Sequence, residues 1–148
     1  MIHKLTLTDE QLRLIQTALD LYSRIGIGQF EHILDHPTFI SQLYTKCTIK
    51  DEQINLVDYT LYHELRDIAK VDLARIRNSL CDLTVGTNGS YGIYSKEVDE
   101  SCRVAYDLVQ AIRHEYWKVN PNKSSVTVDS SVLYSTEGAQ NIKVELDV

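Results

Sequence analysis

Apolar residues between Leu7 and Pro37 recur at intervals of three and four, which is the spacing of residues on one face of an α-helix. The segment opens with Thr8-Asp9-Glu10-Gln11, a capping box in which the Thr8 hydroxyl and the Gln11 amide satisfy free backbone groups reciprocally. Two neighbouring rows predict a central helix that is covered on two sides. The first row contains Leu12, Ile15, Leu19, Tyr22, Gly26, Gln29 and Ile33, and the second contains Leu14, Ala18, Leu21 and Ile25.

Gly26 and Gly28 interrupt this pattern, and each costs about 1 kcal/mol relative to alanine in a helix interior. The helix therefore kinks or ends there, or another backbone or a ligand approaches closely. His36-Pro37 should break the helix, because the residue before a proline avoids the helical conformation. Two interpretations of the glycines stay open: a crossing with another helix, and a site lined by Tyr22, Arg24, Gln29 and Phe30.

Three further helices follow from the same spacing. A short helix covers Thr38 to Lys46. A long helix begins at Asp51, which acts as its N-cap, and it allows a kink near Val71 to Leu73. The apolar face of this long helix contains Ile54, Val57, Leu61, Leu65, Ile68, Ile76 and Leu80, and its polar residues elsewhere include Asp58, Arg66, Lys70 and Arg77. The last helix covers Ser95 to Lys118, with a stripe of Val98, Cys102, Ala105, Val109 and Ile112.

The hydrophobic period changes from helical spacing to alternation near both ends of the chain. Ile2 to Leu7 predicts a short strand, and the alternating residues between Val126 and Val148 predict a hairpin. Cys81 to Tyr94, with three glycines, reads as a turn-rich loop. We therefore expect an α+β fold in a single domain, residues 1–148: three long helices packed with a small antiparallel sheet formed by the N-terminal strand and the C-terminal hairpin.

The net charge and composition of the chain limit the classes of molecule that it is expected to bind. The formal net charge of the 148 residues is −6, which argues against binding a nucleic-acid polymer but leaves room for a small anion held by a few local arginines. Neither a signal peptide nor a membrane-spanning run is apparent, so we expect a cytoplasmic protein without a membrane partner. The three cysteines show no CxxC spacing, which favours buried reduced thiols.

His32-Ile33-Leu34-Asp35-His36 resembles the H-x-x-E-H zinc motif, with an aspartate in place of the glutamate base. Pro37 follows at once, and histidines at a helix end also gain from the negative pole of the helix dipole. No nucleophile elbow, P-loop or dinucleotide-binding fingerprint occurs. We therefore predict no catalytic residues, no metal and no cofactor, and keep a metal-dependent hydrolase using His32 and His36 as the least favoured alternative.

The loop from Asn88 to Ser95 leads into the last predicted helix and suggests a ligand site. A glycine-rich loop before a helix N-terminus offers backbone N–H groups to an anion, tyrosines offer flat faces to a base, and arginines offer forked donors to phosphate. The alternative is a plain loop whose tyrosines pack in the core. The candidate ligand-binding residues are Tyr22, Arg24, Gln29, Asn88, Ser90, Tyr91, Tyr94, Arg103 and Arg113.

Two blocks, LYSRIGIGQFEHIL (Leu21 to Leu34) and NGSYGIYSKEVDESCRVAYDLVQAIRH (Asn88 to His114), resemble small, mostly uncharacterised accessory proteins of tailed bacteriophages. The blocks cover less than a third of the chain and contain no catalytic motif. The resemblance implies a phage accessory protein in the host cytoplasm, of a class that includes proteins countering host defence, some by sequestering nucleotide signals in oligomers. We therefore expect a non-enzymatic homo-oligomer that binds a small nucleotide-like anion. The alternative is an inhibitor that docks on a host protein through its acidic surface.

Overall fold

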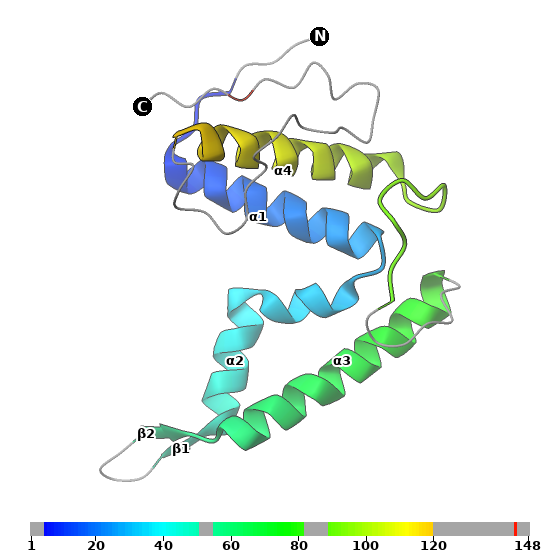
Figure 1. Ribbon diagram of the computed structural model, residues 1–148. Helices are drawn as coiled ribbons and strands as arrows, with labels where there is room; N and C mark the ends of the chain where they lie inside the picture. Colours follow the sequence, from blue (N-terminus) through cyan, green and yellow to red (C-terminus); the bar gives the residue numbers. More distant parts are fainter. Residues whose placement is uncertain (1–4, 51–54, 82–88, 120–143, 145–148) are drawn as a thin grey trace. The chain divides into compact units, whose positions relative to one another are not determined.

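The computed structural model describes residues 5–50, 55–81, 89–119 and 144. Its chain divides into two compact units (Figure 1). Unit 1 combines Met1–Ile27 with Gly92–Val148, and unit 2 is the segment Gly28–Tyr91. The expectation of a single domain stays a prediction.

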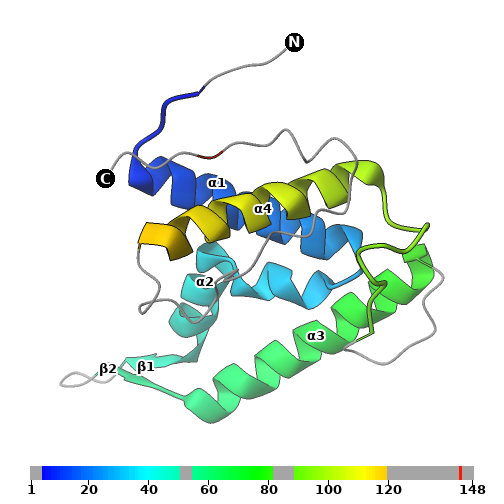
Figure 2. The same cartoon turned by 45° about the horizontal axis from the view of Figure 1, so that its top comes forward.

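Unit 1 is built on two helices, α1 (Asp9–Gly26) and α4 (Glu100–Val119), which lie side by side in Figures 1 and 2. They run antiparallel, since the start of α1 contacts the end of α4: the Tyr116 hydroxyl donates to Asp9 Oδ1 at 2.6 Å. The capping box predicted for α1 is confirmed. The Thr8 N–H donates to Gln11 Oε1 at 2.9 Å, and the Gln11 N–H donates to Thr8 Oγ1 at 3.2 Å.

The core of unit 1 is the predicted stripe of the last helix. All of its residues are buried, together with Ala111: Val98, Cys102, Ala105, Val109 and Ile112.

Cys47 and Cys102 are buried free thiols and Cys81 is a half-buried one, in agreement with the prediction of reduced cysteines. None of the helices in the described part of the chain combines the length and apolar character that crossing a membrane requires.

Gly26 is the point of closest approach between α1 and α4. A Cβ atom built on Gly26 would lie 2.6 Å from the Cβ of Cys102, well inside the contact distance of real side chains. The helix ends at this residue, and Gly28 then adopts a φ of 86°, a left-handed conformation that glycine tolerates best. The helix-crossing interpretation therefore accounts for Gly26, and a backbone turn accounts for Gly28.

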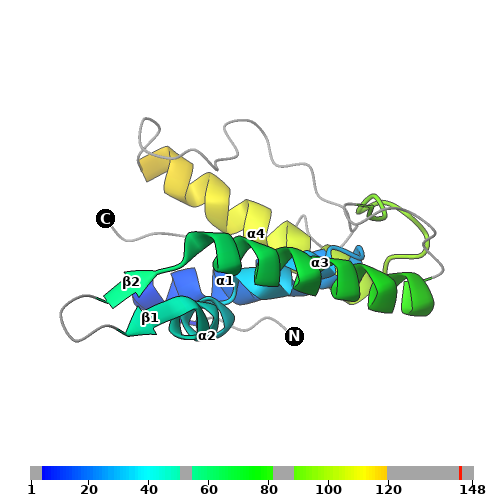
Figure 3. The ribbon, with the colours of Figure 1, turned by 90° about the horizontal axis from the view of Figure 1, so that it is seen from below.

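Unit 2 contains a 3-10 helix η1 (Phe30–Asp35), helices α2 (Pro37–Cys47) and α3 (Tyr59–Cys81), and strands β1 (Thr48–Lys50) and β2 (Asn55–Val57). Pro37 is the first residue of α2, a position at which the missing N–H of proline is harmless. The strands form a hairpin that leads from α2 directly into α3 (Figure 3). Asp58 caps α3 by accepting the Leu61 N–H at 3.0 Å.

The predicted α+β fold class is wrong. The described residues form five helices and one small sheet, and that sheet pairs β1 with β2 rather than an N-terminal strand with a C-terminal hairpin. Residues 5–8 form no strand, and the predicted hairpin of residues 126–148 lies outside the described residues except for Val144. The real hairpin escaped prediction because its three-residue strands are too short to show alternation, while the three-residue step from Ile54 to Val57 imitates a helix.

The predicted start of the long helix is also wrong, and so are the N-cap at Asp51 and the kink, because α3 is one continuous helix from Tyr59 to Cys81. The buried residues of α3 are Tyr62 and Arg77. The Tyr62 ring stacks on Tyr44 of α2 at a centroid distance of 4.9 Å. Arg66, half-buried, reaches Asp35 of η1. The aromatic and basic side of α3 therefore packs within unit 2, and its predicted apolar face remains exposed.

We predict that Gly26→Ala lowers the free energy of unfolding, whereas Gly92→Ala does not. The new methyl group would overlap Cys102, and overpacking costs about 1–3 kcal/mol. The better helix propensity of alanine offsets at most about 1 kcal/mol of that cost. A Cβ on Gly92 meets nothing within 4 Å, so this variant is the matched control. Urea unfolding measures both; a Gly26→Ala protein as stable as the parent would contradict the close crossing.

Candidate functional site

The candidate ligand-binding residues divide between the two units. Tyr22, Arg24, Tyr94, Arg103 and Arg113 belong to unit 1. Unit 2 contains Gln29, Ser90 and Tyr91, and Asn88 lies outside the described residues. Whether all of them form one site therefore stays a prediction, and each unit is examined for the groups that it brings together.

Within unit 1, Arg24 and Arg113 meet on a single carboxylate, that of Asp20. Arg24 Nε lies 2.6 Å from Asp20 Oδ2, and Arg113 Nη2 lies 3.1 Å from Asp20 Oδ1. Asp20 and Arg24 are four residues apart on α1, so they share one face of that helix. Arg113 comes from α4, and the antiparallel packing of the two helices places it there. We call Asp20, Arg24 and Arg113 the Asp20 cluster.

The Asp20 cluster contains two positive charges and one negative charge, so it is net positive, whereas the formal net charge of the whole chain is −6. Its side chains are only 27% (Asp20), 32% (Arg24) and 17% (Arg113) exposed, so solvent screens them less than it screens surface pairs. Asp20 was not among the predicted site residues. Its spacing to Arg24 was a readable signal, whereas its contact with Arg113 depends on the tertiary fold.

Two buried polar atoms on α4 lie at the Asp20 cluster, one on its own Arg113 and one on the neighbouring Gln110. Among the described residues, Arg113 Nε and Gln110 Oε1 have no hydrogen-bond partner. Gln110 and Arg113 are three residues apart, so they are neighbours on the helix surface. A buried donor or acceptor left unsatisfied costs about 1–3 kcal/mol, so this place would gain from a polar group that reaches it.

Tyr22 does not join the Asp20 cluster. Residues two apart on a helix point in nearly opposite directions, so Tyr22 and Arg24 leave α1 on different sides. The Tyr22 hydroxyl lies 2.8 Å from Ser101 Oγ, at the first turn of α4, and the side chain is 49% exposed. Tyr22 therefore helps to join the two helices and still presents part of its ring to solvent.

The prediction that the last helix starts at Ser95 and offers free N–H groups to an anion is wrong. α4 begins at Glu100, and Asp99 occupies the capping position, where its Oδ1 accepts the Ser101 N–H at 2.9 Å. Hydrogen bonds from the Ser101 hydroxyl and N–H hold the pKa of Asp99 below its usual value. A carboxylate at this end satisfies the helix dipole itself and repels a second anion.

Arg103 fastens the turn that precedes α4. Its Nη2 donates to the carbonyl oxygens of Ser95 at 2.6 Å and of Val98 at 3.0 Å. Tyr94, at the start of the same turn, is 62% exposed. The structure therefore gives Arg103 a role in holding the backbone and leaves the ring of Tyr94 accessible.

In unit 2, three contacts fasten the end of the loop. Gln29 Nε2 donates to Ser90 Oγ at 3.5 Å, and the Tyr91 hydroxyl donates to the carbonyl oxygen of Cys81. Arg77, whose side chain is fully buried, donates from Nη1 to the carbonyl oxygen of Gly89 at 2.6 Å. Sequence reasoning placed Arg77 on the polar side of its helix and gave no signal of this buried role.

His32 and His36 have local structural roles. His32 Nδ1 lies 3.1 Å from Asp35 Oδ2, and His36 Nδ1 accepts the Thr38 N–H at 3.3 Å as the cap of α2. No group of three or more histidine, cysteine, aspartate or glutamate residues in the described ranges is placed to hold a metal ion. The metal-dependent hydrolase therefore gains no support from this part of the chain.

A second charged cluster lies at one end of the α1–α4 pair, where α1 begins and α4 ends. Arg13 Nε lies 2.7 Å from Asp9 Oδ2, and its guanidinium carbon lies 4.8 Å from the centre of the Tyr116 ring. Burial, together with the hydrogen bond to Asp9, raises the pKa of Tyr116 to about 12. Hydrogen bonds from Arg13 and then Tyr116 lower the pKa of Asp9. These groups satisfy one another, which marks the cluster as a clamp rather than a binding site.

The chain matches no protein-family model, no curated protein and no solved structure.

We predict that Tyr116→Phe weakens the alkaline loss of stability. The folded-state pKa of Tyr116 lies above its ordinary value of 10.0, so its contribution is complete below pH 10.0 and is lost as the pH rises toward about 12. At neutral pH the variant should be slightly less stable than the parent, because the solvent-screened hydrogen bond to Asp9 is lost. Urea unfolding at a series of alkaline pH values tests this, with the exposed Tyr94→Phe as control. Equal pH profiles for the two variants would contradict the clamp.

Proposed function

We propose that the protein is a non-enzymatic binding protein that holds a small, nucleotide-like anion. The observation that carries this proposal is the convergence of two guanidinium groups, from α1 and α4, on one carboxylate. The resemblance to phage accessory proteins supports the nucleotide-like class of ligand and a role in sequestering a host-defence signal in the host cytoplasm.

The chemistry of the Asp20 cluster fits a phosphate better than it fits a neutral ligand. A guanidinium presents five N–H donors in a planar fork that matches phosphate oxygens. One carboxylate neutralises only one of the two guanidiniums, so a further anion gains a net attraction. Limited exposure strengthens that attraction, because fewer water molecules and ions compete for the charges.

The polar atoms beside the cluster extend the argument to the part of the ligand that is not charged. Arg113 Nε is a donor and Gln110 Oε1 is an acceptor, and neither has a partner in the described residues. A ribose hydroxyl both donates and accepts, so it is the kind of group that either atom would bind. The proposal therefore favours a phosphorylated sugar or nucleotide over inorganic phosphate alone.

We predict that calorimetry and thermal-shift measurements with cyclic nucleotides and ADP-ribose-type compounds detect binding. Arg113→Gln should weaken it by roughly tenfold or more, because a hydrogen bond to a charged group contributes about 1.5–3 kcal/mol. Asp20→Asn should strengthen it in a folded protein, because the internal anion that competes for both guanidiniums is removed. Arg75→Gln is the matched control, since Arg75 lies on α3 in unit 2 and is 76% exposed.

The proposal fails if none of these compounds stabilises the protein, because a tight ligand raises the free energy of unfolding by several kcal/mol and would be plainly visible. It also fails if Arg75→Gln reduces binding as much as Arg113→Gln does. In that case the attraction would belong to total charge and not to the Asp20 cluster.

The second candidate is an inhibitor that docks on a host protein. The observation that favours it is the number of large apolar side chains left exposed in unit 2, including Ile49, Leu56 and Ile68, each more than half exposed. Pull-down from host lysate with the parent and with Ile68→Glu separates the candidates. A partner that is captured by the parent and lost with Ile68→Glu would favour docking, and an empty pull-down beside a positive ligand screen would exclude it.

A further inference from the structure

Four apolar side chains spaced along α3 are exposed. Leu61 is 37% exposed, Ile68 is 59%, Ile76 is 50% and Leu80 is 72%. With half-buried Leu65, these residues lie at intervals of three, four and eight. Leu61, Leu65, Ile68 and Ile76 share one side of the helix, and Leu80 lies at the edge of that side, in line with Tyr62. We call them the α3 face.

The hairpin next to the α3 face is exposed in the same manner. Ile49 and Leu56 are register partners across β1 and β2, so they lie on one side of the hairpin. They are 57% and 59% exposed, and Tyr59, at the start of α3, is 60% exposed. The hairpin is therefore a second exposed apolar area of unit 2.

Helix α3 is amphipathic, and in the described part of unit 2 most of its apolar side chains face outward. Its regular apolar row is the pattern by which helices are buried, yet the side that packs within unit 2 carries Tyr62, Arg66 and Arg77. Solvent exposure of such a row costs free energy that a partner surface would recover. A surface beyond the described part of unit 2 is expected to cover it.

We propose that the α3 face is covered by the α3 face of a second copy of this chain, with the two helices antiparallel. The row reads nearly the same in both directions about the middle of the helix. Reversal places Leu61 opposite Leu80 and Leu65 opposite Ile76. A twofold interface requires this self-complementarity, whereas an unrelated partner does not.

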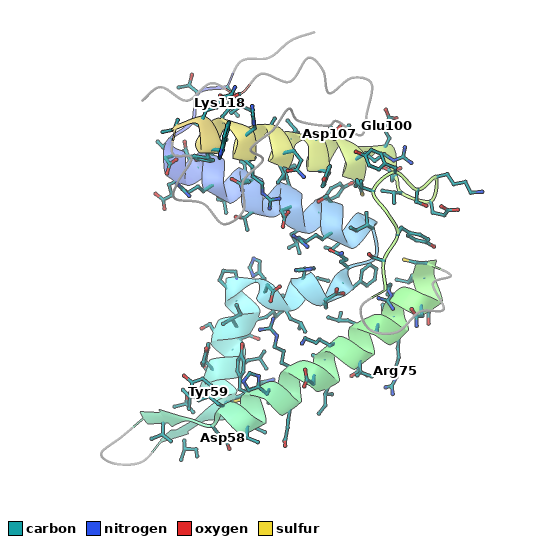
Figure 4. All side chains as sticks on the ribbon, in the orientation of Figure 1. Asp58, Tyr59, Arg75, Glu100, Asp107 and Lys118 are labelled. Carbon is teal, nitrogen blue, oxygen red and sulfur yellow. The ribbon has the colours of Figure 1, made fainter. Side chains whose placement is uncertain are left out.

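The charges beside the α3 face fit the same arrangement. Glu64 and Arg75 lie on the same flank of the row, and Arg75, 76% exposed, projects from the side of α3 away from α2 (Figure 4). A twofold antiparallel pair puts the same flank of both helices on one side, so Glu64 of each copy comes within reach of Arg75 of the other. Arg75 also contacts Asp72 at 3.0 Å, but this ion pair is solvent-exposed and therefore contributes little free energy, so Arg75 can exchange it for a contact with Glu64 of the second copy.

The extent of the surface indicates a weak dimer. A helix of 23 residues is about 35 Å long and about 10 Å wide, so α3 alone offers roughly 350 Å². Standard interfaces bury about 800 Å² per partner, and smaller ones are transient. Dissociation on the order of micromolar or weaker is therefore expected, and Asp72 within the row limits the affinity further.

Sedimentation velocity across a concentration series tests the proposal on the full chain. The parent should pass from monomer to dimer, and Ile68→Glu and Ile76→Glu should each weaken dimerisation at least about tenfold, because a charge would be buried in the contact. Both positions are exposed in the single chain, so the folded monomer should be retained, which circular dichroism checks. A parent that is monomeric at every concentration, or variants that dimerise like the parent, would overturn the proposal.

Charge reversal tests the antiparallel orientation. Glu64→Arg and Arg75→Glu alone should each weaken the dimer, and the double variant should restore it, because opposite charges again meet across the interface. Absence of this rescue would exclude the proposed register. Leu14→Glu, a 70% exposed position on α1, should leave dimerisation unchanged; loss of the dimer in that variant instead would move the interface to unit 1. Ligand binding at the Asp20 cluster is a separate readout, so failure of either proposal is seen independently.

Discussion

The close antiparallel packing of α1 against α4 is the constraint on which unit 1 depends. Contacts along its whole length define it: Tyr116 with Asp9 at one end, Arg113 with Asp20 between, and Gly26 against Cys102 at the other end, where Tyr22 also meets Ser101. Any side chain at Gly26 would force the helices apart, and the pairing of Arg113 with Asp20 tolerates little displacement. The charge distribution of the candidate site is therefore a consequence of helix packing and not of a dedicated loop.

The sequence predicted the helices of unit 1 and their buried face better than it predicted where α4 begins and which charged side chains meet. Thr8 and Gln11 form the expected capping box, and the stripe from Val98 to Ile112 is buried as expected, because capping and amphipathic spacing are local properties. The start of α4 was misplaced because Ser95 and Asp99 are both good capping residues, and only the turn fastened by Arg103 decides between them. Asp20 escaped attention because its second arginine comes from a distant helix.

Unit 2 shows the limit of the same reasoning. Periodicity reveals which side of a helix is apolar, but it does not reveal what covers that side. In α3 the apolar row faces outward while Tyr62 and Arg77 are buried, because α2 supplies an aromatic ring and the Gly89 carbonyl supplies an acceptor for the guanidinium. A buried arginine with such partners is compatible with folding, since its donors are satisfied. An apolar row in the sequence is thus as informative about assembly as about the core.

The two units present different kinds of surface, and this separation has a functional consequence. Unit 1 has a cluster with a net positive charge, and unit 2 has an exposed apolar face. If a protein acts by sequestration, its capacity depends on the number and affinity of its sites, and self-association adds copies of a site without altering any one of them. Binding coupled to assembly would require the ligand to prefer one oligomeric state, since a ligand with equal affinity for both shifts neither. The Asp20 cluster and the α3 face share no residue, so each can be removed by mutation while the other is kept. The affinity for the ligand would change with protein concentration if binding and dimerisation are coupled, and it would stay constant if they are independent.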